Sequence, residues 1–383
     1  MVHERIVFAF CLAFLVFFSA VSHGASYEVP RGSWEVPLQE LEGFANGTTG
    51  GAGGRRALVT STADYAKGEK VVAGSLRDIV ENTSAGKLWI RFSLPVGSKI
   101  TLVRPLMLRS NLTIDGQNKS INITNRINWS QFELDPEKTV GRRQCRRVNH
   151  RQPMGTLFII NRSSNIILNG LNFSRANFNG SPWEESIPDL DKECLGDLIS
   201  IYNDKINRAE YVDRIWINRS SFTQCGDGCI DITRPVSKPA SISITNNIFT
   251  NTDKTMIVGT PYGADDSLFQ EWGGSNDVSY PYRVSVLGNK FVNSNERNPR
   301  VSNAIAHIKN NTYINWGGYV VYAENALVLY EANKHRNGKS KAVISPASKG
   351  VILLKGNTDV NGKPMVELGD SSDFSPWTRV VDQ

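Results

Sequence analysis

From about residue 100 onward, short runs of the chain alternate apolar with other residues and then reach a polar residue two positions before an aromatic one. They read "SNLTIDGQ", "SNIILNGLNFS", "RIWINRSSFT", "ASISITNNIFT", "YRVSVLGNKFV", "AIAHIKNNTYI" and "ALVLYEANKH". Side chains that alternate with period two are typical of β-strands. No helical pattern separates the runs, so we expect an all-β chain.

Aligned at their ends, the runs form two columns of equivalent residues. One column holds Asn247, Asn289, Asn311 and Asn333, of which the last three are 22 residues apart, and the next holds Phe249, Phe291, Tyr313 and His335. This period predicts a solenoid of stacked β coils, in which each asparagine bonds its neighbours above and below and the rings stack inside. The alternative, an antiparallel sandwich, does not place one residue type at a fixed phase. The gap from 247 to 289 holds either one coil and a loop or one long loop.

The first 25 residues predict export. Arg5 precedes the 13-residue apolar run "IVFAFCLAFLVFF", and the small residues Ser22 and Gly24 follow, as in a secretory signal peptide. The run is too short to span a membrane. Asn-x-Ser/Thr sequons fit a secreted glycoprotein, and they begin at Asn46, Asn82, Asn111, Asn118, Asn122, Asn128, Asn161, Asn172, Asn179, Asn218 and Asn310.

The net charge of +6 survives removal of the signal, because Glu4 and Arg5 leave together. A basic secreted protein suits an anionic partner such as an acidic polysaccharide, although charge for solubility is an equal alternative. The segment "GRRQCRRVNHR", 141 to 151, holds five arginines. It is either a solvated loop or a loop that contacts a polyanion.

Four cysteines remain in the mature chain, Cys145, Cys194, Cys225 and Cys229, and four allow three full pairings. Bonded cysteines need Cα atoms within about 7 Å. If the chain around residue 227 is extended, Cys225 and Cys229 cannot bond each other. We therefore expect a disulfide between Cys194 and one of these two.

Two segments precede the repeat. In "GFANGTTGGAGG", 43 to 54, the glycines allow close packing or positive φ. No Lys-Ser/Thr follows, so a phosphate loop is not indicated. "GSLRDIVENTSAG", 74 to 86, predicts a short amphipathic helix capped by Ser75 with Asp78 three residues on. Such a helix can close the end of the solenoid and protect its edge strand.

Acidic and basic residues gather near the later strands. Asp197 precedes "LISIY", Asp227 and Asp231 flank "GCI", Lys254 lies in "TDKTMIVG", and "NERNPRV" carries Arg297 and Arg300. In an extended strand Asp227 and Asp231 are roughly 13 Å apart, so sharing one ion requires a bend, which Gly228 can supply. Three carboxylates without His or Cys then suit Ca²⁺. The alternative is that these acids end strands and bond turn amides.

The chain resembles the pectate lyase family (polysaccharide lyase family 1), over roughly residues 40 to 335. The matching segments are "GFANGTTGGAGG", "GSLRD", "NLTIDGQ", "GDLISI", "RIWINRSSFTQCGDGCIDIT", "ITNNIFTNTDKTMIVG", "NERNPR" and "NNTYINWGGY". The resemblance implies a single-stranded right-handed parallel β-helix. It also implies a calcium-dependent lyase that cleaves (1→4)-α-D-galacturonan (polygalacturonate) by β-elimination to 4,5-unsaturated products.

By this resemblance, the calcium ligands are Asp197, Asp227 and Asp231. Arg297 corresponds to the arginine that removes the C5 proton, and Lys254 to a lysine that grips a substrate carboxylate. Arg300 corresponds to a further basic position for substrate or structure.

Two positions depart from the family pattern. Ser302 stands where the family often has a further arginine, and "WINR" with Asn218 and Arg219 stands for "WIDH". The first change can weaken binding at one subsite. A glycan on Asn218 would crowd the cleft, so we expect Asn218 to be unglycosylated or turned inward.

The resemblance leaves other functions open. A catalytically inactive pectin-binding wall protein on the same fold is the main alternative. A pectin hydrolase requires a GHG-type histidine that is absent, and a lyase for methylated pectin does not need the three aspartates. We expect a secreted, extracellular or cell-wall monomer that binds pectin, with no nucleic-acid or membrane partner. Within 26–383, one domain is expected, with an N-terminal cap at 39–98, coils at 99–356 and a tail at 357–383.

Overall fold

The computed structural model describes residues 34, 36–117, 119–125, 132–134, 145–147, 156–175, 196–203, 210–225, 227–234, 238–259, 282–339, 343–344 and 351–359. The predicted signal peptide, Cys194 and most of the arginine-rich segment 141–151 lie outside these residues. No helix among the described residues is long and apolar enough to span a membrane.

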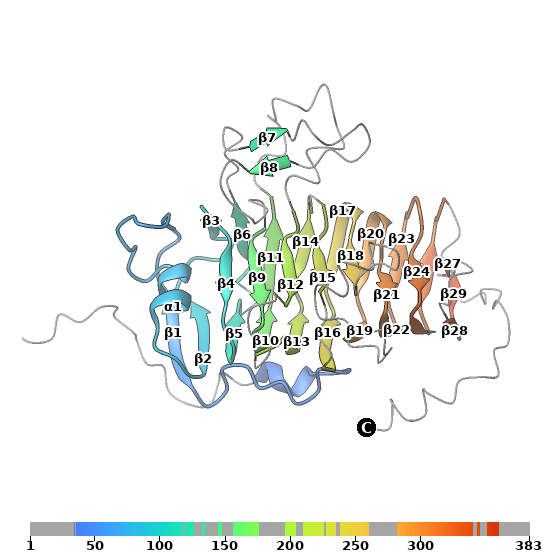
Figure 1. The fold of residues 1–383 in the computed structure, drawn as a ribbon, viewed down its shortest axis with the longest axis horizontal. Coiled ribbons are helices and arrows are strands. Elements are labelled where there is room, and N and C mark those ends of the chain that lie inside the picture. Colours follow the sequence, from blue (N-terminus) through green and yellow to red (C-terminus); the bar gives the residue numbers. More distant parts are fainter. Residues whose placement is uncertain are drawn as a thin grey trace, which may run out of the picture.

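Three long parallel sheets form the body of the protein (Figure 1). The ten-stranded sheet contains, in spatial order, β1 (Arg55–Val59), β2 (Leu88–Phe92), β5 (Leu112–Asp115), β10 (Ser164–Asn169), β13 (Asp213–Asn218), β16 (Ala240–Thr245), β19 (Tyr282–Leu287), β22 (Ala304–Lys309), β25 (Leu327–Glu331) and β28 (Val351–Lys355). The nine-stranded sheet contains β3 (Lys99–Leu102), β6 (Ile121–Asn125), β11 (Leu171–Ser174), β14 (Ser221–Thr223), β17 (Ile248–Lys254), β20 (Lys290–Glu296), β23 (Thr312–Ile314), β26 (Lys334–Arg336) and β29 (Thr358–Asp359).

The eight-stranded sheet contains β4 (Leu106–Leu108), β9 (Phe158–Asn161), β12 (Ile199–Tyr202), β15 (Ile230–Ile232), β18 (Met256–Val258), β21 (Arg300–Ser302), β24 (Val321–Glu324) and β27 (Val343–Ile344). From β2 onward, successive strands of these sheets visit the ten-, nine- and eight-stranded sheets in turn. Only β7 (Phe132–Leu134) and β8 (Cys145–Arg147) stand apart, as an antiparallel pair. Each turn of the chain is therefore one coil, and the predicted parallel β-helix is confirmed.

The predicted asparagine column is present. The backbone N–H and the side-chain amide of Asn289 both donate to Asn311 Oδ1, at 2.8 and 3.0 Å, and Asn311 bonds Asn333 in the same way. Asn247 bonds Asn289 likewise, so residues 247 and 289 lie on adjacent coils, and no further coil separates them. The structure adds Asn357 as a fifth member.

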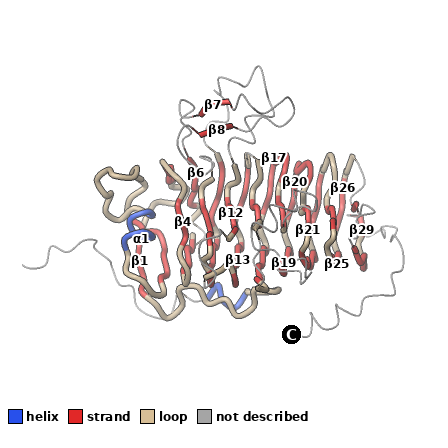
Figure 2. The backbone as a smooth tube through the Cα atoms, viewed as in Figure 1, coloured by secondary structure: helices blue, strands red, loops and turns tan. Residues whose placement is uncertain are grey.

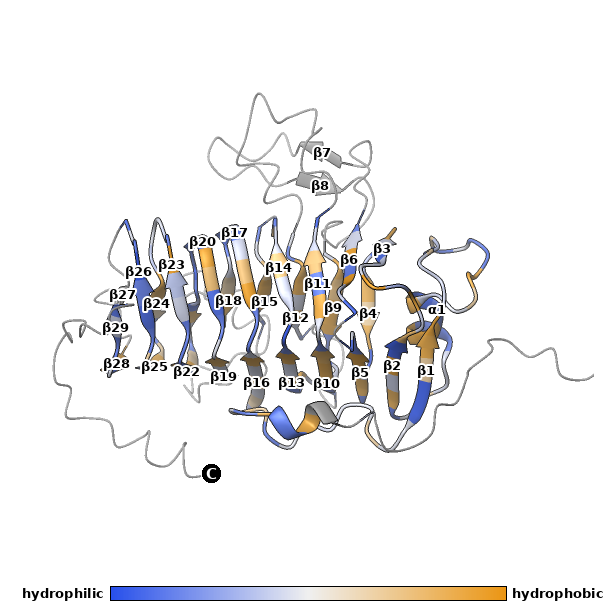
Figure 3. Ribbon diagram, turned by 180° about the vertical axis from the view of Figure 1, so that it is seen from behind, coloured by the Kyte–Doolittle hydropathy of each residue, from blue (hydrophilic) through white to orange (hydrophobic). Residues whose placement is uncertain are grey.

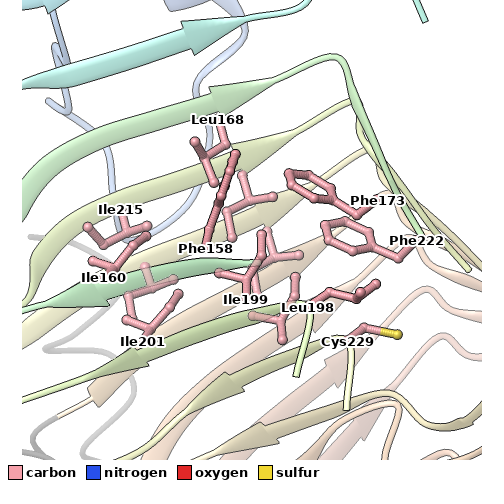
Figure 4. Packing of buried hydrophobic residues seen from close by; sticks show 14 of the residues in the cluster. Phe158, Ile160, Leu168, Phe173, Leu198, Ile199, Ile201, Ile215, Phe222 and Cys229 are labelled. Carbon is pink, nitrogen blue, oxygen red and sulfur yellow. The ribbon is translucent and has the colours of Figure 1, made fainter. Parts of the chain in front are cut away.

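The aromatic column is also present and extends further toward the N-terminus. Neighbouring rings stack with centroids 4.8 to 5.3 Å apart, through Phe173, Phe222, Phe249, Phe291, Tyr313 and His335. Figure 4 shows the rings of Phe173 and Phe222 side by side, among buried aliphatic side chains. Figure 3 shows hydrophobic segments within β11 and β20, whereas β26, the neighbour of the last strand of this sheet, is hydrophilic.

The predicted helix is α1 (Leu76–Asn82), which lies at the β1 end of the stack (Figure 2). Ser75 Oγ accepts the Asp78 N–H at 3.1 Å, and Asp78 Oδ2 accepts the Gly74 N–H at 3.0 Å, which confirms the predicted cap. Leu76 and Val80 join the hydrophobic core. A 3-10 helix, η1 (Val36–Glu40), precedes it in the chain. The domain boundaries at 98 and 356 stay predictions.

The glycine-rich segment crosses the outer face of the ten-stranded sheet. The Phe44 N–H donates to Ser285 Oγ at 2.9 Å, and the Gly51 N–H donates to Thr113 Oγ1 at 2.9 Å. A Cβ at Gly43, where φ is +84°, would lie 2.5 Å from Ser285, and one at Gly51 would collide with a backbone carbonyl. These glycines therefore serve close packing, not phosphate binding.

The asparagine column generates a stability prediction. Asn311→Ala should lower the free energy of unfolding by about 2 to 3 kcal/mol, because it leaves the buried amide of Asn289 without its acceptor. Thr312→Ala, on the half-buried position next to it, is the control and should cost under about 1 kcal/mol. Denaturant unfolding measures both, and equal losses would show that the column does not hold the coils together.

Candidate functional site

Three positions that the sequence pointed to lie side by side, just before neighbouring strands of the eight-stranded sheet begin. Because β12, β15 and β18 pair in register, Asp197, Gly228 and Lys254 form one row, each two residues before its strand begins. The sequence placed Asp227 beside Asp197, but the structure places Gly228 there, with Asp227 one residue earlier. Lys254 pairs with Glu296 on the next coil, and Arg297 follows Glu296.

The chain does bend between Asp227 and Asp231. Cys225 and Cys229 form a disulfide with Cα atoms 4.8 Å apart. The expectation that they could not bond was wrong, and so was the pairing of either with Cys194. It assumed an extended strand, whereas β15 begins only at Ile230 and the chain bends at Asp227 and Cys229.

Gly228 opens the space in which the carboxylates of neighbouring coils meet. A Cβ at this position would lie 2.7 Å from Asp231 Oδ1 and 3.0 Å from Asp197 Oδ1. Asp197 Oδ2 accepts a hydrogen bond from Ser200 Oγ at 2.8 Å, and Asp231 Oδ1 accepts the Ile257 N–H at 3.2 Å. Asp197 Oδ1 is buried and accepts no N–H or hydroxyl from the described residues, while a side-chain hydrogen bond with Asp231 lowers the pKa of Asp197. Only glycine leaves room for this pair of carboxylates.

The carboxylates repel one another. Burial, followed by the charge of Asp227, raises the pKa of Asp197 to about 6. Burial and then the charges of Asp197 and Asp227 raise the pKa of Asp231 well above its ordinary value, while Arg297 opposes this rise. The protonation of Asp197 and Asp231 therefore depends on the charges of Asp227 and Arg297 as well as on each other.

The basic residues are held by acids. Lys254 Nζ lies 3.2 Å from Asp227 Oδ1. Arg300 Nη2 lies 2.7 Å from Glu324 Oε2, and its guanidinium lies over the Tyr322 ring. In the sheet, Arg300 stands two strands from Asp231, with Ile257 between them in the same row. This row therefore carries an acidic side chain, Asp231, and two strands further along a basic one, Arg300.

Arg297 adopts φ 58° and its side chain is 19% exposed. Its Nε lies 3.6 Å from Glu296 Oε1. Burial raises the pKa of Tyr319 to about 12, and a hydrogen bond with Arg297 offsets part of this rise. Tyr319 and Glu324 were not assigned from the sequence, because only the coil stacking brings them beside the two arginines.

The carboxylate oxygens of the three aspartates are of the chemical type that binds a hard divalent cation, but the three side chains are not arranged around one point. Within the described ranges, no three His, Cys, Asp or Glu side chains form a group arranged to hold a metal ion. Asp197 and Asp231 share one space and leave a buried oxygen that accepts no N–H or hydroxyl from the described residues, as oxygen ligands of a cation would. The ion pair with Lys254 holds Asp227, so a third ligand requires that pair to open.

Of the residues that depart from the family pattern, Ser302 and Asn218 are buried, whereas Arg219 is exposed and its Nη2 lies 2.8 Å from Glu40 Oε1. Ser302 is fully buried, and its hydroxyl lies 3.5 Å from Glu324 Oε2. Asn218 is also fully buried, but on the face of β13 opposite the core residues Ile215 and Ile217, where its amide donates to Asn169 Oδ1 at 2.9 Å and lies 3.5 Å from Glu40 Oε2. It ends β13 in the ten-stranded sheet, so it does not border the acids. A separate hollow of about 480 Å³, lined by Glu42, Lys309 and others, contains none of the predicted site residues.

No family model matches the chain. Pectate lyase 1 of Hesperocyparis arizonica is 28% identical over 301 residues, which cover 76% of this chain and 65% of that protein. The putative pectate lyase 17 of Arabidopsis thaliana is 28% identical over 299 residues, covering 76% of this chain and 61% of the relative. The chain thus spans less than two thirds of the length of these relatives.

Solved pectate lyase structures share the fold. The crystal structure of Jun a 1, the major allergen from cedar pollen, matches with a TM-score of 0.57 at 24% identity, covering 87% of this chain and 85% of that one. Pectate lyase Bsp165PelA from Bacillus sp. N165, in complex with trigalacturonate, matches with a TM-score of 0.51 at 18% identity, covering 88% and 91%. In sequence over most of its length, and in its parallel β-helix fold, the chain resembles the pectate lyases.

The crowding of the acids predicts an effect of charge removal. In calcium-free buffer at pH 8, Asp231→Asn should raise the free energy of unfolding by about 1 kcal/mol. A carboxyl whose pKa is raised in the folded state favours folding below its unfolded pKa, and this contribution is lost as the pH rises through the folded pKa. For Asp197 that window runs from 3.8 to about 6.

The gain from Asp231→Asn should therefore vanish below about pH 4, as measured by denaturant unfolding at both pH values. Asp253→Asn is the control, because Asp253 accepts the Asn295 amide at 2.8 Å and lies outside the acid group, which consists of Asp197, Asp227 and Asp231. A variant Asp231→Asn that is less stable than the parent at pH 8 would refute the repulsion.

Proposed function

We propose that the protein is a secreted, calcium-dependent pectate lyase that cleaves polygalacturonate by β-elimination. One observation carries the proposal: Asp197 and Asp231 of adjacent coils share the space at Gly228, while Asp227 beside them is paired with Lys254 and Arg297 lies within electrostatic reach. The similarity to pectate lyases supports the substrate class.

In this proposal, Asp197, Asp227 and Asp231 hold Ca²⁺. When bound, calcium neutralises the galacturonate carboxylate and so stabilises the negative charge that develops after loss of the C5 proton. Lys254 is released from Asp227 and pairs with a substrate carboxylate. Arg300 stands in the row of Asp231, two strands away, and orients a neighbouring sugar.

Arg297 is the proposed base that takes the C5 proton. The electrons of that C–H bond then form the C4–C5 double bond as the C4–O bond breaks, and the departing oxygen takes up a proton from solvent in place of the one that Arg297 accepts, so no water is consumed. Guanidinium groups ordinarily keep their proton. The proposed role therefore requires an alkaline reaction and nearby cations, which favour loss of the guanidinium proton. The backbone fixes the residue in a left-handed conformation between Glu296 and Asn298.

A pectin-binding protein without catalysis is the second candidate. Both cations proposed to grip substrate are already paired, Lys254 with Asp227 and Arg300 with Glu324. The position of the family's further arginine is filled by the buried Ser302. Such a protein would bind polygalacturonate and release no unsaturated product.

Substitution of Arg297 tests the catalytic role. Arg297→Ala should lower kcat by about 10²-fold or more, because proton transfer by a positioned side chain contributes that much. Arg214→Ala, an exposed arginine on the ten-stranded sheet, should keep wild-type activity. Ultraviolet absorbance of the unsaturated product measures both with calcium present. Equal activity of the two variants would remove Arg297 from the mechanism.

Lys254→Ala separates binding from catalysis. Loss of this cation should raise KM for polygalacturonate about tenfold, since the substrate carboxylate loses its partner. Lys334→Ala, an exposed lysine on β26, serves as the control. An unchanged KM, measured under the same conditions, would mean that Lys254 serves only as the ion-pair partner of Asp227.

A further inference from the structure

Arg175 contacts the backbone that carries the acid group (Asp197, Asp227 and Asp231), and it has no part in the proposed reaction. It directly follows β11, and its side chain is buried, with the residue 2% exposed. Its guanidinium Nη2 donates to the carbonyl oxygen of Gly196, the residue before Asp197. The Asp227 N–H donates to the same carbonyl oxygen at 3.2 Å. One carbonyl therefore joins the guanidinium to both acid-bearing segments.

The position of Arg175 in the coils makes its buried charge unusual. Because β11, β14, β17, β20 and β23 pair in register, Arg175 shares a column with Gln224, Asn251, Asn293 and Asn315. Those four residues are neutral amides, and all are exposed. On the other side of Arg175 the same register places Asn125, which is buried but neutral, so Arg175 is the charged exception in the column. Burying a charge costs several kcal/mol unless other charges or hydrogen bonds compensate it.

The compensating charges are those of the acid group. Burial lowers the pKa of Arg175 to about 10, while Asp197 and then Asp227 oppose this change, so the guanidinium stays charged at neutral pH. In return, Arg175 opposes the rise in the pKa of Asp197 that burial and Asp227 cause. The favourable interaction is thus mutual.

We propose that Arg175 is a built-in counter-cation of the acid group, a fixed positive charge that stabilises Asp197 and Asp227 without metal and limits how tightly they bind a divalent cation. It contacts the backbone that carries the acids, so it is a positioning residue. The second half of this proposal rests on the proposed calcium site, and the first half does not.

A metal-free double-mutant cycle tests the first half. In chelator at pH 8, Arg175→Met should lower the Tm by about 5 °C or more, because two acids lose their counter-charge. Adding Asp197→Asn should restore at least half of that loss, since one of the unpaired negative charges is gone. If Arg175→Met alone does not fold, the double variant should still fold. A double variant no better than Arg175→Met would overturn the proposal.

Arg109→Met is the matched control for this cycle. Arg109 also donates to backbone carbonyls, those of Thr83 and Ser84, at 3.3 and 2.8 Å. Its destabilisation should be independent of Asp197→Asn. Equal coupling of Asp197→Asn to both arginine variants would show a general effect on stability and would also overturn the proposal.

Calcium titration by calorimetry tests the second half. Arg175→Met should bind CaCl₂ about tenfold more tightly than the wild type, because a nearby positive charge is removed, and Arg175→Lys should bind as the wild type does. Unchanged or weaker binding by Arg175→Met would overturn this half. A wild type that binds no calcium would instead refute the proposed function, and the metal-free cycle would still decide the role of Arg175.

Discussion

In-register stacking of the coils determines where every side chain of this protein lies. Each coil repeats the same three strands, so residues tens of positions apart in sequence become neighbours across a strand spacing of about 4.8 Å. The buried asparagines, of which Asn289 and Asn311 are examples, enforce this register, because each backbone and side-chain amide finds its acceptor on the next coil. The aromatic stack fills the interior behind them. A slip of one residue would break both columns at once.

The same stacking produces the acid group. Asp197, Gly228 and Lys254 share a row only because their strands pair in register. The absence of a side chain at Gly228 lets Asp231 reach Asp197 from the neighbouring coil. The repulsion that follows is countered from two sides, by Lys254 at 3.2 Å from Asp227 and by the buried Arg175. The site therefore contains both negative and positive side chains in the absence of ligand.

The regular part of this architecture follows from the sequence, whereas the exceptions do not. A 22-residue period revealed the columns, but Asn357 follows Asn333 by 24 residues and was missed. The helix cap at Ser75 was predictable because it depends on residues three apart. The Cys225–Cys229 disulfide was not, since the alternation around it looked like a continuous strand while the chain bends before β15. Three acids could be grouped from sequence, yet which one faces Asp197 depended on a register shift of one residue. Arg175 could have been noticed as the one charged residue in a column of amides.

Product formation by the wild-type protein is the most direct test of whether this site performs elimination chemistry. The measurement is ultraviolet absorbance during incubation with polygalacturonate at alkaline pH, first with added calcium and then with excess chelator. We predict absorbance that rises with calcium and stops when chelator is added. A flat trace from folded protein that still binds polygalacturonate, across pH and methylation levels, would contradict the lyase and leave a pectin-binding protein.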